Sequence, residues 1–310
     1  MLTKKIAKND ESEYRELRKL WCDVFGDDSE YVDSVYDSLD AYGWVALSDD
    51  RAVSALTVFE IGCLDGRTVS CIYAVCTHPD YRSRGYAREL IRTAVAAIEA
   101  EGKLAIVSPA SESLVKYYAN LEFCNNSYAC GKSVCLYAED GEIENVNYEP
   151  EITSDEEESI PEIELKLQAV DAATYGEYRE QFLFEYNHIR LHNKFLEFIK
   201  EDSYAGQGML LVNGGDAICV LNGCEGGELR LAELIVNPEL ARFSSEIDEQ
   251  IATGMAELFE ADKITYRMPV LEADHNCADH DTNTSNKLYI QSMLSGCDEE
   301  ENIYFGFPMD

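Results

Sequence analysis

Basic side chains are scarce in this sequence. Its 310 residues contain 25 Lys and Arg against 60 Asp and Glu, which gives a formal net charge of −35. Proteins that hold nucleic acid or dock on anionic lipid gather Lys and Arg to meet phosphate, so this balance disfavours nucleic-acid and membrane partners. It is compatible with a cationic partner, and equally with a surplus of charge that only keeps the chain soluble.

Long apolar runs are missing as well. No stretch approaches the ~18 apolar residues that a membrane span requires, and the N-terminus, MLTKKIAKNDESEY, lacks the apolar core of a signal peptide. The 11 cysteines are odd in number and include no CxxC pair, which favours reduced thiols over a disulfide framework. These features predict a cytoplasmic protein.

The apolar content is nevertheless sufficient for one or two cores, because 46% of the residues are hydrophobic and 10% are aromatic. The length corresponds to about two domains of roughly 150 residues each. Residues 139–164 contain 12 acids, no base and two prolines, a composition typical of a linker. We therefore predict a first domain over 1–138, an acidic linker over 139–162 and a second domain over 163–310.

Apolar periodicity predicts the same element order in both halves: strand, two helices, three strands, helix, strand, helix and closing strand. In the first half the predicted strands are 2–7, 44–47, 53–61, 68–77, 104–107, 123–128 and 133–137, and the predicted helices are 14–25, 31–39, 85–100 and 113–120. In the second half the predicted strands are 163–170, 209–212, 217–221, 228–236, 263–268 and 303–307, and the predicted helices are 172–186, 189–200, 244–259 and 284–294. This order predicts an α/β fold whose architecture is duplicated, although the two halves share almost no matching residues.

The most informative segment is CIYAVCTHPDYRSRGYAREL, residues 71–90. A strand ends at Pro79, a short basic loop follows, and a helix with one apolar stripe begins near Gly85. The N-terminus of a helix offers free backbone amides and the positive end of the helix dipole. Gly85 permits close backbone approach, and Ala87 is small. The segment therefore predicts a pyrophosphate-binding site.

Three blocks of sequence resemble the GCN5-related N-acetyltransferases. Residues 82–87, RSRGYA, resemble the family's R-x-x-G-x-G/A signature, and residues 117–123, YYANLEF, resemble its L-Y-x-x-L-G-F segment with departures at Tyr117 and Glu122. Residues 20–27, LWCDVFGD, look like a bacterial subgroup with two such domains, similar in plan to the enhanced-intracellular-survival acetyltransferases without their extra C-terminal domain. The strong match spans about 72–123. The resemblance implies a mixed α/β sheet in two tandem GNAT-like acyl-CoA acyltransferase domains, of which the second is degenerate.

The resemblance also implies roles for individual residues. Acetyl-CoA would be the co-substrate, with the Val75 amide polarising the thioester carbonyl and Tyr118 protonating the departing thiolate, a role for which Tyr117 competes. The implied cofactor-binding residues are Val75, Cys76 and Thr77 on the strand and Arg82, Ser83, Arg84, Gly85, Tyr86 and Ala87 in the loop.

The sequence does not single out a base for the attacking ammonium. Glu60 stands in an otherwise apolar strand and faces either the cleft or solvent. His78 is near the predicted cofactor site, but its position before Pro79 favours a loop-capping role. Asp310 is a third candidate, because in the survival-protein relatives the C-terminal carboxylate reaches the active site. A chain of water molecules is the remaining alternative.

Two sets of residues suggest a metal site instead. His188 and His192 would share one helical face, and residues 274–281, DHNCADHD, crowd several ligand types into one loop. Neither set has a second cluster at zinc spacing, so we expect no metal. In the second half, residues 236–244 read VNPELARFS without glycine, which predicts that this half does not bind acetyl-CoA and instead shapes the acceptor cleft.

The sequence thus predicts an N-acetyltransferase that transfers acetyl by direct attack of a primary amine. The acceptor would be a small molecule or a peptide, and the acidic surround favours a cationic one. Assembly into a homo-oligomer is compatible with the sequence. The alternatives are a catalytically reduced acyl-CoA sensor or interaction scaffold, and a metal-dependent enzyme built on the His-rich loop.

Overall fold

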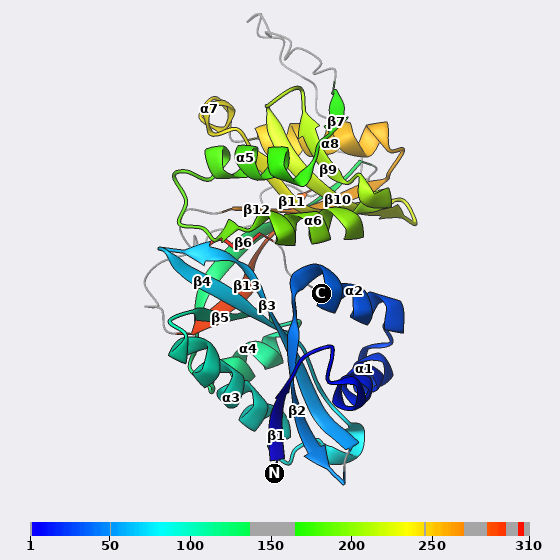
Figure 1. Ribbon diagram of the computed structural model, residues 1–310. Coiled ribbons are helices and arrows are strands. Elements are labelled where there is room, and N and C mark those ends of the chain that lie inside the picture. Colours follow the sequence, from blue (N-terminus) through cyan, green and yellow to red (C-terminus); the bar gives the residue numbers. More distant parts are fainter. Residues whose placement is uncertain are drawn as a thin grey trace, which may run out of the picture.

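Two lobes share one continuous mixed sheet in the computed structural model, which describes residues 2–49, 51–136, 165–244, 246–269, 284–295 and 303–306 (Figure 1). The sheet contains 13 strands in the order β1-β2-β3-β4-β5-β13-β6-β12-β11-β10-β9-β7, and β8 pairs with β3 outside this path. Strands β1–β5 form the core of the N-terminal lobe and strands β7 and β9–β12 that of the C-terminal lobe. Strands β6 and β13 join the two.

The N-terminal lobe follows the predicted element order. Its strands are β1 (Leu2–Ile6), β2 (Tyr42–Ser48), β3 (Arg51–Leu64), β4 (Arg67–Thr77), β5 (Leu104–Val107) and β6 (Phe123–Cys135), and its helices are α1 (Glu11–Phe25), α2 (Ser29–Leu39), the 3-10 turn η1 (Pro79–Tyr81), α3 (Tyr86–Ala100) and α4 (Glu112–Ala119). Helices α1 and α2 cover one face of the sheet, and α3 and α4 cover the other. The two closing strands predicted over 123–137 are one strand, β6.

The C-terminal lobe repeats this plan, which confirms the predicted duplication of architecture. Its strands are β7 (Leu167–Ala169), β8 (Arg190–Leu191), β9 (Met209–Val212), β10 (Ala217–Glu225), β11 (Glu228–Val236), β12 (Lys263–Pro269) and β13 (Thr284–Ser295), and its helices are α5 (Ala172–Phe182), α6 (Asn193–Asp202), the 3-10 turn η2 (Tyr204–Gly206), α7 (Pro238–Ala241) and α8 (Ile247–Leu258). Helix α5 packs on β9, β10 and β11, and α8 packs on the other face. The prediction of a helix over 284–294 is wrong, because this segment is strand β13.

The two lobes exchange strands. Strand β13, from the second half of the chain, lies between β5 and β6, and β6, from the first half, lies between β13 and β12. Figure 1 shows both strands where the two lobes meet. The N-terminal sheet is therefore completed only by a strand that comes about 180 residues later in the chain than β5.

A second set of contacts closes the interface between the lobes. Strand β8 pairs with β3, with Gly62 opposite Leu191. A Cβ atom on Gly62 would lie 2.1 Å from the carbonyl oxygen of Arg190, so only glycine permits this approach. Nearby, the ring of Phe59 stacks on that of Phe195 at 6.3 Å. One hydrophobic cluster accordingly contains residues from both lobes.

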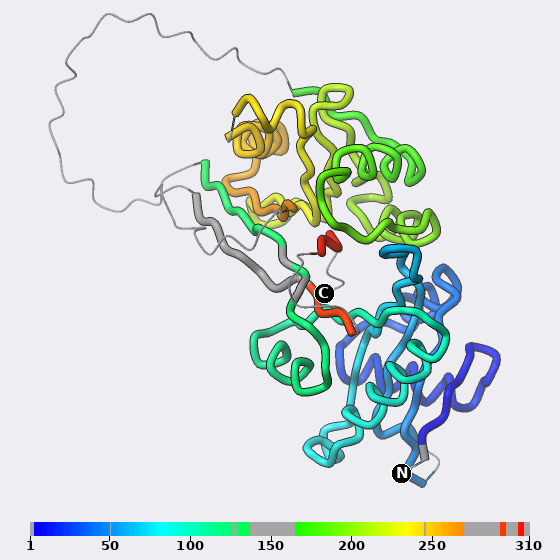
Figure 2. The backbone as a smooth tube through the Cα atoms, turned by 90° about the vertical axis from the view of Figure 1, so that its left-hand side faces the viewer, coloured from blue at the N-terminus to red at the C-terminus, as the bar shows by residue number. Residues whose placement is uncertain are grey.

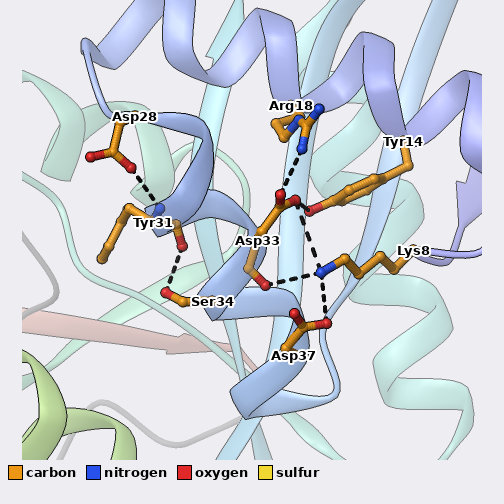
Figure 3. Close-up of polar contacts among 8 residues, drawn as sticks. All are labelled: Lys8, Tyr14, Arg18, Asp28, Tyr31, Asp33, Ser34 and Asp37. Carbon is orange, nitrogen blue, oxygen red and sulfur yellow. Dashed lines mark hydrogen bonds and ion pairs between the residues drawn. The ribbon is translucent and has the colours of Figure 1, made fainter.

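A polar network fixes the corner between α1 and α2 (Figure 3). The Asp33 carboxylate accepts hydrogen bonds from the Tyr14 hydroxyl at 2.7 Å and from Arg18 Nη1 at 2.6 Å. Lys8 Nζ adds an ion pair with Asp37 at 2.6 Å. The Asp28 side chain caps α2 by accepting from the Tyr31 amide at 2.7 Å. This network holds the α1–α2 corner beside strand β4.

The described helices include none that is both long enough and apolar enough to cross a bilayer. All nine cysteines in the described ranges are free thiols. Burial raises the pKa of the Cys76 thiol to about 12, which agrees with its interpretation as a small buried strand residue rather than a nucleophile.

Candidate functional site

Strand β4 separates from β5 in its second half. The two strands pair in parallel only between Val69–Cys71 and Leu104–Ile106 within the described residues. On its other side β4 continues along β3, but Ala74 and Val75 stand opposite a single residue, Leu56. Ala74 adopts φ +48°, as expected at a bulge. The bulge turns the end of β4 away from β5 and opens a wedge between the two strands.

The end of β4 is held to β3 by side chains. The Ser54 hydroxyl donates to the Cys76 carbonyl at 2.8 Å and lies 2.8 Å from the Thr77 hydroxyl. His78 Nδ1 then accepts the Asp80 amide at 3.3 Å and caps the turn η1. The loop-capping interpretation of His78 is therefore confirmed. A rigid strand end is what a site on the following loop requires.

Helix α3 begins with free amides. Its N-cap is Gly85, with φ +84° and no side chain to accept a helix amide. The first intrahelical bond runs from the Glu89 amide to the Gly85 carbonyl at 3.1 Å, so the amides of Tyr86 and Ala87 have no helical partner. A Cβ on Gly85 would meet no atom within 4 Å. The helix end therefore presents open space and positive charge to a ligand.

Four arginines lie in the loop and the first two turns of α3, and the described residues give them no acidic partner. Arg82, Arg84, Arg88 and Arg92 are all exposed, and none of them forms an ion pair with any residue in the described part of the chain. Arg82 Nε donates to the Thr77 carbonyl at 3.1 Å, which ties the loop to β4. In a chain with 60 acids and 25 bases, such a group of unpaired cations favours a polyanionic ligand.

Tyr118 lies on the same face of the sheet. It is 7% exposed, and its ring packs edge-on against those of Tyr117 and Phe123. Desolvation, with smaller contributions from Tyr117 and Cys71, raises the pKa of Tyr118 above its usual value. The hydroxyl makes no hydrogen bond to the described residues. Tyr118 can therefore hold its proton at neutral pH and donate it to a bound group.

Tyr117 points to a different environment. It is half-buried, and burial raises the pKa of its phenol while Arg88 and Arg92 lower it. Both arginines belong to the group at the start of α3. Tyr117 thus lies beside the predicted anion site, whereas Tyr118 lies in the apolar layer between α3, α4 and the sheet.

The opposite face of β4 carries a set of residues that the sequence analysis missed. The Tyr73 ring packs on Trp21 at 5.4 Å, and the Tyr73 hydroxyl lies 3.1 Å from that of Tyr31. Trp21 Nε1 donates to Asp27 at 2.6 Å. Asp202, at the end of α6, is close enough to Tyr31 to raise its pKa, although burial of Tyr31 is the larger cause. These residues come from α1, α2, β4, α6 and the loop between α1 and α2, so only the tertiary structure brings them together.

The structure does not bring Glu60 to the end of β4. Glu60 lies opposite Ser70, five residues before Val75, or about 16 Å along the strand at ~3.3 Å per residue. Its carboxylate forms an ion pair with Lys103 at 2.8 Å. Asp310 lies outside the described residues.

The corresponding loop of the C-terminal lobe is neutralised. Asn237 caps a turn that begins at Pro238, just as His78 precedes Pro79. Arg242, however, pairs with Glu185 at 2.6 Å. Asp248 and Glu249 occupy the first turn of α8. Both acids pair with Lys132, at 2.7 and 3.0 Å, so this helix end holds one more acid than base. The expectation that this lobe does not bind acetyl-CoA stays a prediction.

The two histidines do not share a helical face, so that prediction is wrong. His188 precedes strand β8 and bridges Tyr304, whereas His192 is the N-cap of α6. Within the described ranges, no group of three or more His, Cys, Asp or Glu side chains is placed to hold a metal ion. The loop 274–281 lies outside these ranges.

Comparison with known proteins gives a family-model match over most of the N-terminal lobe. Residues 5–123 match the family model described as an acetyltransferase (GNAT) domain. A comparison with curated proteins gives no match. The family model covers β4, the loop, α3 and α4, which together carry the site.

Solved structures extend the likeness to both lobes. A GCN5-related N-acetyltransferase from Anabaena variabilis superposes with a TM-score of 0.63 at 14% identity, covering 94% of this chain and 72% of its own. A probable N-acyltransferase from Enterococcus faecalis gives 0.63 at 12% identity, with the same coverage of 94% and 72%. Eis1 from Mycobacterium abscessus gives 0.56 at 9% identity, covering 95% and 73%. At these identities the likeness establishes the fold alone.

Proposed function

Because residues 5–123 match the model of an acetyltransferase (GNAT) domain, we propose that the chain transfers acetyl from acetyl-CoA to a primary amine. The observation that carries the proposal is the group of unpaired arginines around the uncapped start of α3. The pyrophosphate of coenzyme A has the charge and size that this helix end accepts. The extended pantetheine arm fits the wedge between β4 and β5.

The reaction needs two groups from the protein besides the anion site. The backbone amide of Val75, at the bulge of β4, would donate to the thioester carbonyl as negative charge develops on its oxygen. The ammonium first loses a proton to solvent water, and the neutral amine then forms its bond to the carbonyl carbon. The carbon–sulfur bond breaks, and the new amide nitrogen releases its remaining extra proton to water. Tyr118 then gives its proton to the departing thiolate and regains one from water, a role supported by its hydroxyl, which has no hydrogen-bond partner among the described residues.

The acceptor amine would approach from the other face of β4. Two carboxylates lie near the Tyr31–Tyr73 hydroxyl pair there: Asp27 adds to the raised pKa of both tyrosines and Asp202 to that of Tyr31, after the larger effect of burial. Neither carboxylate forms an ion pair with a base in the described part of the chain. This arrangement supports a cationic acceptor, either a small molecule or a basic peptide, because aromatic rings and carboxylates together attract an ammonium group.

Calorimetric titration with acetyl-CoA tests the proposal. We expect the wild-type protein to bind one equivalent, and Gly85→Trp to abolish binding by filling the space before α3. Ser244→Trp is the matched control, because Ser244 stands at the same distance from Pro238 as Gly85 does from Pro79. Absence of binding to the wild type, or equal loss in both variants, would overturn the proposal.

A further inference from the structure

A buried ion pair lies in the interior of the C-terminal lobe. Arg179 on α5 is 1% exposed and Glu233 on β11 is fully buried. Arg179 Nε lies 3.3 Å from both carboxylate oxygens of Glu233, and the Tyr175 hydroxyl donates to the same carboxylate at 2.7 Å. Nothing in the proposed reaction uses these groups.

The remaining donors of Arg179 hold two other segments of the chain. Nη1 donates to the Ile189 carbonyl at 3.0 Å, and Nη2 donates to the Phe305 carbonyl at 2.8 Å. The next residue, Gly306, has φ +97°, and a Cβ there would lie 2.1 Å from Glu233 Oε1. The segment Ile303–Gly306 is therefore seated directly against the ion pair. Figure 2 shows this segment in red between the two lobes.

The same helix face carries the same residue pair in the other lobe. The pattern D-x-x-x-Y-x-E-x-R occurs at 10–18 and again at 171–179. In the N-terminal lobe its Tyr14 and Arg18 bind Asp33, a partly exposed residue of α2. In the C-terminal lobe the equivalent pair binds a buried carboxylate on a strand. The Tyr and Arg side chains thus bind the neighbouring helix in the N-terminal lobe and the sheet in the C-terminal lobe.

Glu233 lies at the position on β11 that corresponds to the bulge on β4. Counting back from the equivalent prolines, Glu233 precedes Pro238 by the same five residues that separate Ala74 from Pro79. Ala74 belongs to the bulge of the proposed acyl-binding strand. The C-terminal lobe therefore fills the corresponding place with a carboxylate and uses it to hold the chain segment 303–306.

A column of aromatic rings leads from this segment to strand β4. Phe305 stacks on Phe195 at 6.2 Å, and Phe195 stacks on Phe59 at 6.3 Å. Phe59 packs against Tyr73 at 5.8 Å, and Tyr73 packs against Trp21 at 5.4 Å. Packed side chains of this kind transmit a displacement, because the interior has no free space to absorb it.

We propose that Arg179 and Glu233 are positioning residues for the acceptor side of the N-terminal site. The hydrogen bond from Arg179 to the Phe305 carbonyl fixes the Phe305 ring, and this keeps the column of aromatic rings packed against Tyr73 and Trp21. The degenerate lobe thus contributes to the active site through its buried ion pair rather than through a ligand. The part of this inference that concerns turnover rests on the proposed function, and the part that concerns packing does not.

The test replaces both charges together. Removing one partner would leave a buried charge and could prevent folding, whereas an ion pair exchanged for apolar residues of similar volume is generally tolerated. Arg179→Met/Glu233→Leu therefore keeps the lobe filled but loses the bonds to the carbonyls of Ile189 and Phe305. The matched control is Ile251→Ala, which weakens the opposite face of the same lobe, where Ile251 is 2% exposed.

Trp21 provides the readout. The chain has two tryptophans, so a Trp44→Phe background leaves Trp21 as the single tryptophan, in contact with Tyr73. Excitation beyond the tyrosine absorption band then selects its emission. We expect the double variant to raise the acrylamide-quenching constant of Trp21 about twofold, at a temperature where it is fully folded. Ile251→Ala is expected to leave the constant unchanged. An unchanged constant in the double variant, or an equal rise in both, overturns the proposal.

Kinetics supply the second readout, with spermine as the probe amine. In the double variant we expect the KM for spermine to rise about fivefold and the KM for acetyl-CoA to stay within about twofold of wild type. An unchanged KM for spermine in a turning-over enzyme contradicts the positioning role. Failure of the wild type to bind acetyl-CoA would overturn the proposed function alone, because the quenching result stands without it.

Discussion

Substitution of Tyr118 gives the most direct test of the proposed chemistry. Its burial keeps the phenol protonated at and above its usual titration range. We expect Tyr118→Phe to lower kcat about 100-fold with little change in the KM for acetyl-CoA, because general-acid groups contribute rates of this order. Release of coenzyme A, followed with a thiol reagent, measures both constants.

The neighbouring tyrosine is the matched control. Tyr117→Phe removes a hydroxyl from the same helix and is expected to retain most of the wild-type kcat. The raised pKa also predicts that kcat does not fall through loss of the Tyr118 proton up to about pH 9.5, below the ordinary phenol pKa of about 10. A larger loss in Tyr117→Phe than in Tyr118→Phe would reverse the assignment.

Glu60 gives a prediction of the opposite kind. Its carboxylate is paired with Lys103 at the far end of β4 from the bulge. We expect Glu60→Gln to keep kcat within about twofold of wild type, and to cost at most about 1 kcal/mol of stability, since the pair is exposed. A kcat that drops in the neutral range and recovers at high pH would instead identify Glu60 as the base.

At the scale of elements, the α1–α2 corner is held by one carboxylate (Figure 3). Asp33 accepts from both Tyr14 and Arg18, and its side chain is 32% exposed. We expect Asp33→Asn to lower the free energy of unfolding by about 1–2 kcal/mol, the range for charged hydrogen bonds reduced by partial screening. Urea denaturation followed by far-ultraviolet circular dichroism measures the change.

Asp37→Asn is the control for that measurement. Asp37 is on the same helix, but it pairs only with Lys8 and is 66% exposed. Its substitution is expected to change stability by less than about 0.5 kcal/mol. Equal effects of the two substitutions would show that the corner is held by apolar packing rather than by the network around Asp33.

Local patterns made most elements predictable. The stripe Leu90, Ile91, Ala94 and Ile98 places α3 correctly because all four side chains are buried on one face of that helix. The segment 284–294 has apolar residues at helical spacing, yet it forms β13. Its paired residues on β5 and β6 come 150 or more positions earlier in the chain, and pairing on both sides overrides local preference.

The two sides of the candidate site also differed in how far the sequence could predict them. The loop from Arg82 to Ala87 could be predicted because a strand, a glycine and a helix are contiguous in the sequence. The acceptor side could not, since Trp21, Tyr73 and Asp202 belong to three elements that only the folded lobes bring together. The repeated Tyr and Arg of α1 and α5 were visible in the sequence, but their different partners were not.

At the scale of the whole molecule, the exchanged strands predict how the protein unfolds. In neither lobe is the sheet complete without a strand from the other half of the chain, and one hydrophobic cluster spans both lobes. We therefore expect a single calorimetric transition in which the van't Hoff and calorimetric enthalpies agree. Two separated transitions would contradict this expectation, and Ile251→Ala is expected to lower the single midpoint without splitting it.

The place of β13 between β5 and β6 also has a consequence for synthesis on the ribosome. Residues 1–136 contain the loop from Arg82 to Gly85, helix α3 and Tyr118, and they emerge first. The edge of β5 nevertheless stays open until residues 284–295 have been translated. An unpaired strand edge attracts other chains. The nascent protein must therefore protect β5 for most of its translation, and the wedge proposed to hold acetyl-CoA stays next to an open strand edge until then.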